Sequence, residues 1–532
     1  MAGYLENARS TTGTSTRHKD TSPISGMCPI CVRECGHLCE IGKSAFRGRE
    51  VLYPNPEEFG RSTQASNKDY FLDWSHFQIM VEVRGASGIE ADSDKALFPN
   101  VDISTVAGGI PLKVPAIIAA LGSTAVAKRN WDGLAMGAAI SGTIMTIGEN
   151  VCGMDKDAKF DSAGKVIHSP DLAYRIESFR RFWDGKHGDI VVQTNVEDTR
   201  AKIDLFAMKE LMVNTIERKW GQGAKAIGGE VRIFDLDTAL MLKKRGYIVL
   251  PDPTDPAVQD AFKDRVFQSF ERHSRVGMPE EKSFVEDIAW LRSQGAKRVF
   301  LKTGAYNPAV VAFTLKCASQ ANIDMVTFDG AGGGTGMSPV PMMQECSTPT
   351  IYLLAQVLQG IRILKQKGKH IPDIAFAGGF INETQIFKAI AMSNLGDGHG
   401  PYIKTISMAR APLTAAMKSD YFVELAEKGN LPHKFGELYG GSPEHFFVAS
   451  TDFQNGATPG QDLPWPALGV YTYMTDRLGV GLKQLMAGAR KWRLDLLDRD
   501  DITALTPHAA RVTGIQPVWE AGEETMNRIL DF

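Results

Sequence analysis

One stretch of the chain reads Phe328-Asp-Gly-Ala-Gly-Gly-Gly-Thr-Gly-Met-Ser-Pro339. The apolar run Ile323-Asp-Met-Val-Thr-Phe328 leads into it and has the β-branched residues typical of a buried strand. Thr348-Pro349 then predicts the cap and first residue of an amphipathic helix. Its apolar stripe consists of Leu354, Val357, Leu358, Ile361 and Leu364. The glycines therefore lie in a strand-to-helix loop, where α/β proteins bind ligands, and the flanking elements disfavour the alternative of a flexible linker.

The same alternation of strand and helix continues from about residue 100. Eight apolar segments predict strands at Val114–Leu121, Ser141–Thr146, Ile190–Thr194, Gly228–Ile233, Arg298–Lys302, Met325–Phe328, Ile374–Ala377 and Thr405–Met408. Residues 195–220 and 256–297 are expected to be helix-rich excursions between strands. Eight strands separated by helices favour an α/β fold with a parallel (β/α)8 TIM barrel over an open sheet.

The pattern divides the chain into four regions. Residues 1–26 are rich in Ser, Thr and charge and predict a mobile tail. Residues 27–99 form a cysteine-rich segment and connector, and residues 100–445 form the barrel. Residues 446–532 are expected to form a helical C-terminal appendage that covers the barrel or makes an oligomer contact.

Composition excludes several classes of protein. A hydrophobic content of 43% and a charged content of 23% are those of a soluble globular protein. A net charge of −3 gives no reason to expect nucleic acid or an anionic membrane as a partner. No apolar stretch is long enough to span a bilayer, and the N-terminus has no secretion signal. We expect a cytoplasmic homo-oligomer.

Four of the seven cysteines fall close together, in Cys28-Pro-Ile-Cys31-Val-Arg-Glu-Cys35-Gly-His-Leu-Cys39. Thiolates at this C-x2-C-x3-C-x3-C spacing can converge on one metal centre, and clustered cysteines in a large cytoplasmic chain favour metal over disulfides. A 4Fe–4S cluster is the favoured interpretation. Zinc, which more often takes two separated cysteine pairs, and unliganded thiols are the alternatives. His37 is expected to be a surface or packing residue.

Barrel proteins form their sites at the carboxyl ends of the strands. Gly378-Gly379 and Ala409-Arg410 follow the last two predicted strands, the usual place of a barrel phosphate site. Lys302 ends an apolar strand, and because unpaired lysine is almost never buried, we expect its cation to stabilise anionic charge on a ligand. Glu149 and Lys219 have two open interpretations, as site residues or as a salt-bridged pair at the barrel rim.

With these residues, the chain resembles the FMN-binding domain of glutamate synthase over roughly residues 100–415. The matching motifs, in the same order, are Gly148-Glu149, Lys219-Trp-Gly-Gln-Gly-Ala-Lys225, the glycine-rich run, Ala377-Gly-Gly379 and Arg410-Ala-Pro-Leu413. The part from Leu478 to Gly514 is similar to the stand-alone, archaeal-type members of this family.

The resemblance implies FMN as cofactor. The residues that it places at the cofactor are Ala120, Leu121, Gly122, Lys302, Asp329, Gly332, Gly333, Gly334, Gly378, Gly379, Ala409 and Arg410. The phosphate is expected at Gly378, Gly379, Ala409 and Arg410. The flavin ring is expected near Ala120, Leu121 and Lys302, and the Lys302 cation would stabilise the reduced ring.

The resemblance also implies a substrate and a reaction. A 2-oxo acid or its imine is expected near Lys219 and Gln222, with Glu149 and Gly333 close by, and Lys219 is expected to pair with a substrate carboxylate. The catalytic residues that the resemblance implies are Lys219, Gln222, Glu149 and Lys302. The implied reaction reduces a 2-iminoglutarate-like intermediate to an amino acid with a hydride from FMN.

The chain departs from the family in three places. It begins Met1-Ala2-Gly3 without an amidotransferase domain before the barrel, so we expect free ammonia, an amine or a separate glutaminase subunit as the nitrogen source. No cysteine follows Cys346, so the family's 3Fe–4S site is not expected. The N-terminal cluster would instead pass electrons to FMN from ferredoxin or an NAD(P)H-linked subunit. Ala226-Ile-Gly-Gly229 stands where the family has an acidic residue.

Two alternative functions remain open from the sequence. One is an N-methylglutamate synthase-like enzyme, in which an alkylamine replaces ammonia. The other is a flavin- and cluster-binding subunit that relays electrons or senses redox state without turning over a substrate. Lys219, Gln222 and Glu149 favour an enzyme, because a relay needs no carboxylate pocket.

Overall fold

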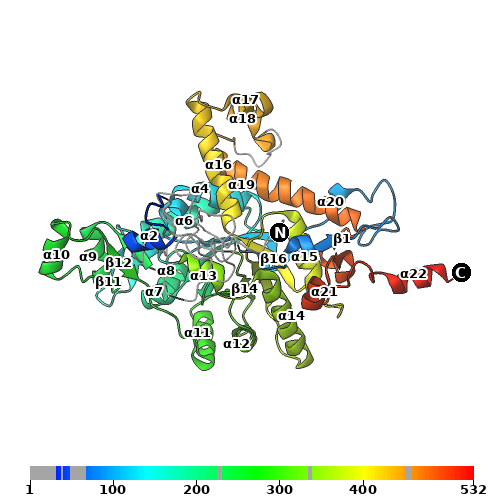
Figure 1. The fold of residues 1–532 in the computed structure, drawn as a ribbon, viewed down its shortest axis with the longest axis horizontal. Coiled ribbons are helices and arrows are strands. Elements are labelled where there is room, and N and C mark those ends of the chain that lie inside the picture. The colour runs from blue at the N-terminus through cyan, green and yellow to red at the C-terminus, as the bar shows by residue number, and fades with distance from the viewer. Residues whose placement is uncertain are drawn as a thin grey trace.

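A computed structural model describes residues 32–36, 40–47, 68–223, 227, 230–333, 338–450 and 458–531. Its centre is a closed barrel of eight parallel strands (Figure 1). In order around the barrel they are β4 (Ala116–Leu121), β5 (Met145–Ile147), β8 (Ile190–Thr194), β9 (Thr215–Lys219), β13 (Arg298–Thr303), β14 (Met325–Asp329), β15 (Asp373–Ala377) and β16 (Ile403–Met408). The predicted (β/α)8 TIM barrel is confirmed.

One predicted barrel strand is wrong. The segment that we expected at Gly228–Ile233 contains strand β10 (Glu230–Ile233), which pairs antiparallel with β12 (Phe270–His273) outside the barrel. The fourth barrel strand is instead β9, which lies within the expected helix-rich excursion 195–220. Its sequence, Thr-Ile-Glu-Arg-Lys, contains three charged residues and no apolar run. The search for apolar strands therefore missed it.

Helices cover the outside of the barrel. They are α4 (Trp131–Ile140), α6 (Pro170–Arg180), α8 (Ile203–Lys209), α11 (Glu281–Ser293), α12 (Pro308–Gln320), α14 (Thr350–Gln366), α15 (Glu383–Ser393) and α16 (Arg410–Glu427). The stripe predicted for α14 is buried through Ile361, with Leu364 partly buried against it. The helix begins at Thr350 and Pro349 is its N-cap, so the predicted cap residue Thr348 lies before the helix. The Thr348 hydroxyl donates to the Tyr306 carbonyl at 2.9 Å.

A hairpin closes the amino-terminal end of the barrel. Strands β2 (Thr105–Ala107) and β3 (Ile110–Leu112) pair antiparallel, and their apolar side chains join a buried cluster with Phe300 and Met325. Gly108 at the turn has φ +56°, and a Cβ there would come within 2.3 Å of the Phe300 ring. The hairpin turn therefore requires glycine, and ligands are left with the opposite, carboxyl end of the barrel.

A small antiparallel sheet is inserted between β9 and β13. Its order is β10, β12 and β11 (Ile248–Leu250), and helices α9 (Leu236–Lys244) and α10 (Pro256–Lys263) belong to the same insertion. The insertion is tied to the chain after β5, because the Arg245 guanidinium donates to the carbonyls of Gly153, Asp155 and Ala158. It therefore lies beside the loop that follows β5.

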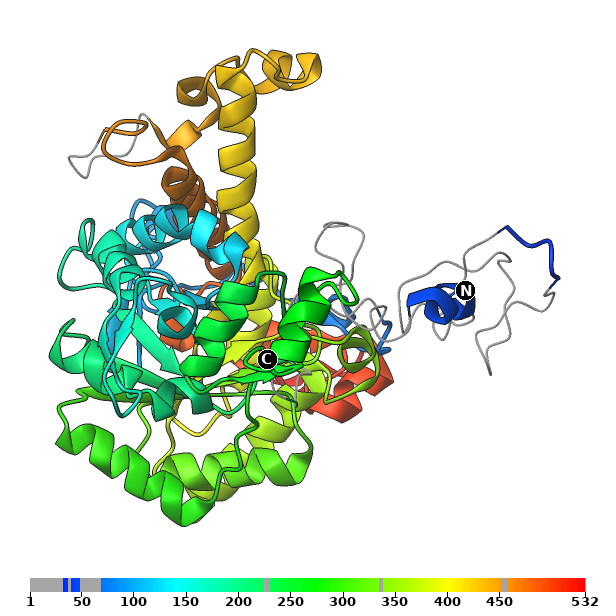
Figure 2. The same cartoon turned by 90° about the vertical axis from the view of Figure 1, so that its left-hand side faces the viewer.

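The chain after the barrel is largely helical. Helix α19 (Trp465–Tyr471), the π-helix η6 (Thr472–Val480) and α20 (Gly481–Gly488) follow one another as one run (Figure 1). Helix α19 lies beside α4 and α16, and α20 lies beside α15. Helix α16 extends away from the barrel and carries α17 (His433–Tyr439) and α18 (Pro443–Phe446) at its far end (Figure 2).

Both ends of the described chain meet at one small sheet. Strand β17 (Ile502–Ala504) pairs antiparallel with β1 (Phe77–Ile79), and α21 (Pro507–Thr513) and α22 (Glu523–Leu530) follow it. In the described part of the chain, no helix is long and apolar enough to cross a membrane.

Candidate functional site

The inward-facing side chains of the barrel change from apolar to polar toward the carboxyl ends of the strands. Val191 on β8 and Phe300 on β13 belong to the apolar cluster above the hairpin. Two residues further along the same faces stand Gln193 and Lys302, both buried. The Gln193 side-chain amide donates to the Glu217 carboxylate of β9 at 2.6 Å. A buried polar layer therefore lies directly below the loops in which barrel sites form.

Lys219, at the end of β9, joins two loops. Its ammonium donates one hydrogen bond to the Glu149 carboxylate and another, at 2.5 Å, to the side-chain oxygen of Gln222. The Lys219 side chain is 9% exposed and that of Glu149 is 24% exposed. Three of the four expected catalytic residues thus lie together, and the salt-bridged pair that the sequence left open is present. The half-buried setting lets a ligand carboxylate compete with Glu149 for the ammonium.

The loop that carries Glu149 is held from below by a buried carboxyl group. Asn150 lies in the left-handed region at φ +65°, and its backbone N–H donates to both Asp198 carboxyl oxygens at 3.1 Å. Burial raises the pKa of Asp198 to about 7, against the lowering effect of hydrogen bonds from Asn150 and Asn195 and of the Lys219 charge. Asp198 therefore positions Glu149 and changes charge near neutral pH.

Lys302 is buried but not unpaired. Its residue is 5% exposed, and its ammonium lies 3.4 Å from the Asp329 carboxylate at the end of β14. We expected Lys302 to avoid burial because an unpaired lysine is rarely buried. The structure buries Lys302, and Asp329 supplies the counter-charge. Burial also raises the pKa of Glu217, and the nearby Lys302 opposes that rise. Lys302 is thus a buried cation between two carboxyl groups, the fourth expected catalytic residue.

The two glycine-containing loops after β14 and β15 touch through their backbones. Gly378 has φ +123°, and a Cβ there would come within 2.5 Å of the Thr350 hydroxyl oxygen. A Cβ on Gly332 or Gly333 would come within 3.2 Å of backbone atoms of Gly378. The Thr350 hydroxyl donates to the Gly378 carbonyl at 2.7 Å. The loops therefore form one cradle without side chains; the expected cofactor residue Gly334 lies outside the described residues.

The helix after β16 begins beside this cradle without a side-chain cap. Ala409 is the N-cap of α16, and no side chain accepts a hydrogen bond from the first turn. By contrast, α15 has a capping box of Asn382 with Gln385. Gly379 and Arg410 are exposed, and no ion pair of Arg410 occurs among the described residues. The N–H groups of α16 are therefore open to an anion, whereas those of α15 are already capped.

The loops after β4 and β5 also pack backbone to backbone. A Cβ on Gly122 would come within 2.6 Å of the Glu149 carbonyl, and the Gly148 N–H donates to the Leu121 carbonyl at 2.9 Å. Ala120, Leu121 and Gly122 are each partly exposed. The expected flavin-ring residues on β4 therefore border the loop that holds Glu149.

The cysteine motif falls largely outside the described residues. Cys28, Cys31 and Cys39 are not described, and Cys35 is a partly exposed free thiol. Within the residues that the structure describes, no three His, Cys, Asp or Glu side chains are grouped to hold a metal ion. The iron–sulfur cluster stays a prediction from the sequence.

Sequence reasoning missed three buried residues of the site: Gln193, Asp198 and Glu217. Asp198 had a readable signal, since Asn195 and Asp198 form a capping box directly after a predicted strand. Glu217 had none, because the segment that contains it was expected to be helical.

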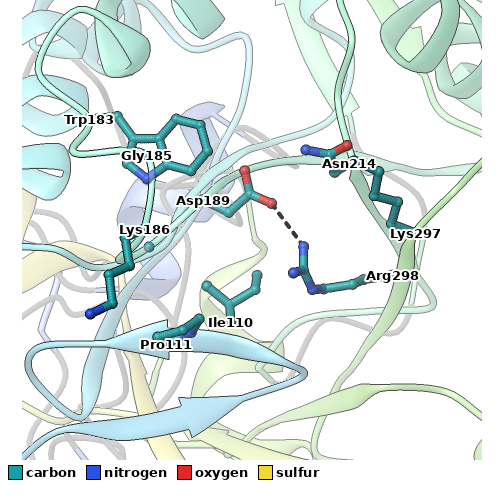
Figure 3. Close-up of a pocket in the computed structure, with 10 residues that line it drawn as sticks. Ile110, Pro111, Trp183, Gly185, Lys186, Asp189, Asn214, Lys297 and Arg298 are labelled. Atoms are coloured by element: carbon teal, nitrogen blue, oxygen red, sulfur yellow. Dashed lines mark ion pairs between the residues drawn. The ribbon is translucent and has the colours of Figure 1, made fainter.

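A cavity of about 150 Å³ lies at the other end of the barrel (Figure 3). It is lined by Ile110 of the hairpin and by residues at the starts of β8 and β13, and Asp189 and Arg298 face each other across it at 3.5 Å. The amino-terminal face of such barrels serves stability, so we place the functional site at the carboxyl end.

Residues 271–399 match the family model described as the conserved region in glutamate synthase. This match contains Lys302, the glycine-rich loop and Gly378-Gly379. The chain is also 24% identical over 304 residues to an archaeal NADPH glutamate synthase of Archaeoglobus fulgidus. That alignment covers 56% of this chain and 47% of the relative, so the chain matches about half of the relative's length. Parts of the chain are therefore similar in sequence to glutamate synthases.

Solved structures with a similar course of chain include flavoproteins. A mutant of flavocytochrome b2 with pyruvate bound has a TM-score of 0.46 and 13% identity, with 90% of this chain and 86% of that chain covered. A mutant of an active chimera of (S)-mandelate dehydrogenase has a TM-score of 0.42 and 15% identity, with 81% and 88% covered.

Proposed function

We propose that the protein is an FMN- and iron–sulfur-dependent oxidoreductase of the glutamate synthase type, which reduces a 2-iminoglutarate-like intermediate to an amino acid. The observation that carries the proposal is that Lys219, Gln222 and Glu149 meet at the mouth of the same barrel that holds Lys302 and the glycine cradle. A group that can bind a carboxylate and glycine loops that expose backbone at one barrel mouth are what such a reaction requires.

The residues at the barrel mouth fit FMN. The uncapped start of α16, with exposed Arg410 and Gly379 beside it, offers N–H groups and a cation for the phosphate. Gly332 and Gly378 let the two loops meet through their backbones, Asp329 lies beside Gly333, and the Lys302 ammonium offers positive charge where a reduced ring is anionic. When bound, FMN would supply the hydride.

The residues around Lys219 fit the substrate. In the proposed complex the ammonium exchanges Glu149 for a substrate carboxylate, and Gln222 keeps its hydrogen bond and orients the lysine. Glu149, released from the ion pair, becomes available to exchange a proton with the substrate nitrogen. Asp198 holds the Glu149 loop in place through Asn150.

The chain enters the body of the protein beside the glycine-rich loop. The Tyr352 hydroxyl of α14 donates to the Tyr70 carbonyl at 3.1 Å, and Lys68 pairs with Glu345 at 2.6 Å. Residues 68–70 follow the four-cysteine motif in sequence, so this anchoring supports an electron port near the barrel mouth. The proposed donor is ferredoxin or an NAD(P)H-linked subunit, and a separate glutaminase subunit is a possible source of ammonia.

An anaerobic substrate screen tests the proposal. The purified protein, reduced with dithionite, is mixed with 2-oxoglutarate or another 2-oxo acid, together with ammonia, glutamine or methylamine. We expect flavin reoxidation and amino-acid formation with 2-oxoglutarate and ammonia. Product with methylamine alone would establish the alkylamine alternative. A protein that binds FMN and a cluster but forms no product with any pair would be an electron relay instead.

A further inference from the structure

The run of helices after the barrel contains a nine-residue π-helix. It is η6, which lies between α19 and α20. π-Helical segments are rare in proteins and are frequently found at functional sites. Tyr473 and Arg477 on this segment both contact the chain that follows β15. The π-helix therefore meets the barrel at one of the two loops that form the glycine cradle.

Two polar contacts join the π-helix to this loop. The Tyr473 hydroxyl donates at 2.7 Å to the carbonyl of Ile381, two residues after Gly379. The Arg477 guanidinium forms an ion pair of 2.6 Å with Glu383, in the first turn of α15. Because the Glu383 side chain is only 10% exposed, its charge needs this partner.

A glycine directly after the π-helix makes room for the ion pair. Gly481 begins α20, which packs against α15. A Cβ on Gly481 would come within 2.9 Å of the Glu383 Cγ and within 3.0 Å of the Arg477 Nη1. The close approach of the C-terminal region to the start of α15 therefore depends on the missing side chain.

The same run also contacts the second element of the proposed phosphate site. Both α19 and η6 lie against α16, the helix whose uncapped first turn begins at Arg410. A Cβ on Gly469 of α19 would come within 1.9 Å of the Ser419 hydroxyl oxygen of α16, so these two helices also approach closely. The C-terminal run thus touches both the loop after β15 and α16, the two elements to which the proposed function assigns the phosphate.

We propose that Tyr473 and Arg477 position the loop from Gly378 to Asn382 for a flavin phosphate, and so make the protein selective for FMN over riboflavin, which has the same ring system without the phosphate. The inference rests on the proposed function for the place of the phosphate. Both side chains are positioning residues, since they act through the loop.

Each of the two side chains has a distinct effect on the loop. Tyr473 fixes the course of the backbone after Gly379, and a loop held in its binding conformation loses less conformational entropy when the ligand arrives. Arg477 compensates the charge of Glu383, a carboxylate four residues after Gly379 that would otherwise repel the phosphate.

Titrations of the full-length protein, stripped of flavin, test the proposal without turnover. Flavin fluorescence measures the dissociation constants of FMN and of riboflavin. We expect the wild type to bind FMN about a hundredfold more tightly, because riboflavin lacks the charged hydrogen bonds of the phosphate. Tyr473→Phe should weaken FMN binding about three- to tenfold, the range of one hydrogen bond, and leave riboflavin binding within about twofold.

Arg477 gives an independent test of the same loop. Arg477→Met should weaken FMN binding about two- to fivefold, the range for a partly exposed ion pair, and again spare riboflavin. Arg477→Lys should restore most of the FMN affinity, because it keeps a positive charge beside Glu383.

Tyr174→Phe is the matched control, because the Tyr174 hydroxyl donates to Asp132 and joins α6 to α4 instead of holding this loop. It should leave both dissociation constants within about twofold. Equal weakening of FMN and riboflavin binding in Tyr473→Phe would show that the π-helix only supports the barrel in general, and would overturn the inference.

The outcomes separate the inference from the proposed function. A wild type that prefers FMN, with a preference that is unchanged in Tyr473→Phe and in Arg477→Met, would overturn the inference and leave the proposed function standing. A wild type that binds neither flavin would overturn both.

Discussion

Lys219 is a nearly buried cation whose main partner can be exchanged. The Lys219 side chain is 9% exposed, whereas that of Glu149 is 24% exposed, and in the proposed complex Glu149 turns toward solvent when the substrate carboxylate arrives. Gln222 remains on the ammonium and holds it in place. A lysine held in this way recognises a carboxylate without the cost of ordering a free side chain.

Replacing Lys219 separates substrate recognition from cofactor binding. Lys219→Ala should lower the rate of 2-oxoglutarate-dependent flavin reoxidation by about a hundredfold, the cost of losing one preorganised charge. FMN content should stay unchanged, because Lys219 is not in the glycine cradle. Stopped-flow absorbance measures both, with Lys316→Ala, which removes an ion pair on the surface, as control. Unchanged reoxidation would remove the substrate role.

Asp198 links the site to pH through its buried carboxyl group. Burial raises its pKa from 3.8 to about 7 in the folded protein. The folded state therefore keeps a proton that the unfolded state releases, and the free energy of unfolding falls as pH rises from about 4 to about 7.

Asp198→Asn should flatten this dependence. The wild type should lose melting temperature relative to the variant between pH 5 and pH 8, as measured by differential scanning calorimetry. Asp501, with a pKa also raised to about 7 by burial but located in the C-terminal region, provides a control. Asp501→Asn should flatten the profile as well but leave 2-oxoglutarate binding unchanged, whereas Asp198→Asn should weaken it. Parallel profiles for Asp198→Asn and the wild type would contradict the charge assignment.

At the scale of elements, strand β9 shows how a charged sequence enters a barrel. The Arg218 guanidinium forms two hydrogen bonds of 2.8 Å with Asp287 of α11 and an ion pair with Asp204 of α8. Glu217 points inward to Gln193. The strand therefore connects the outer helices to the polar interior and delivers Lys219 to the mouth.

The contact between the loops after β14 and β15 depends on missing side chains. A Cβ on Gly378 would meet the Thr350 hydroxyl at 2.5 Å and the Gly330 Cα at 2.8 Å, and the backbone at φ +123° disfavours any other residue. Since Gly330 is held through its N–H bond to the Ala377 carbonyl, neither loop can withdraw freely.

Gly378→Ala should therefore damage both stability and cofactor binding. We expect a loss of about 1–3 kcal/mol in the free energy of unfolding, from strain and the clash, and weaker FMN binding. Gly368→Ala is the control, because Gly368 also has positive φ, +59°, but open space around its Cα. Urea unfolding and flavin fluorescence measure the two effects. Equal effects of the two variants would show that backbone strain alone, and not the cradle, is responsible.

At the scale of the whole molecule, segments from both ends of the chain stabilise the barrel mouth and flank. The described chain after residue 68 packs against α14, and β1 pairs with β17 from the far end of the sequence. Helix α19 lies on α4 and α16, and α20 lies on α15.

The electron route gives a prediction at this scale. Replacing Cys28 and Cys31 by Ser should stop reduction of the flavin by ferredoxin and spare reduction by dithionite, because a small reductant needs no cluster. Absorbance at the flavin band follows both reactions, and Cys346→Ser, an exposed cysteine outside the motif, is the control. Loss of both reactions in the double variant would mean that the motif is structural.

The sequence alone determined the class of fold and most of the candidate site. Seven of the eight barrel strands are largely apolar, and local pattern is sufficient for them because parallel strands buried on both faces are usually apolar. Glycine-rich turns directly after such strands predicted the two loops after β14 and β15, which the structure joins at Gly378. The resemblance placed Lys219 and Gln222 near the same ligand, and the structure joins these two side chains by a hydrogen bond.

Only the tertiary structure decided the rest. Strand β9 reads as polar, and its place in the barrel depends on Asp204, Asp287 and Gln193, which lie far from it in sequence. The role of Asp198 likewise depends on its burial at the Asn150 backbone, next to Glu149. A charge costs free energy in the interior unless a partner or a ligand meets it, and that partner is set by contacts across the fold, which no local pattern of residues contains.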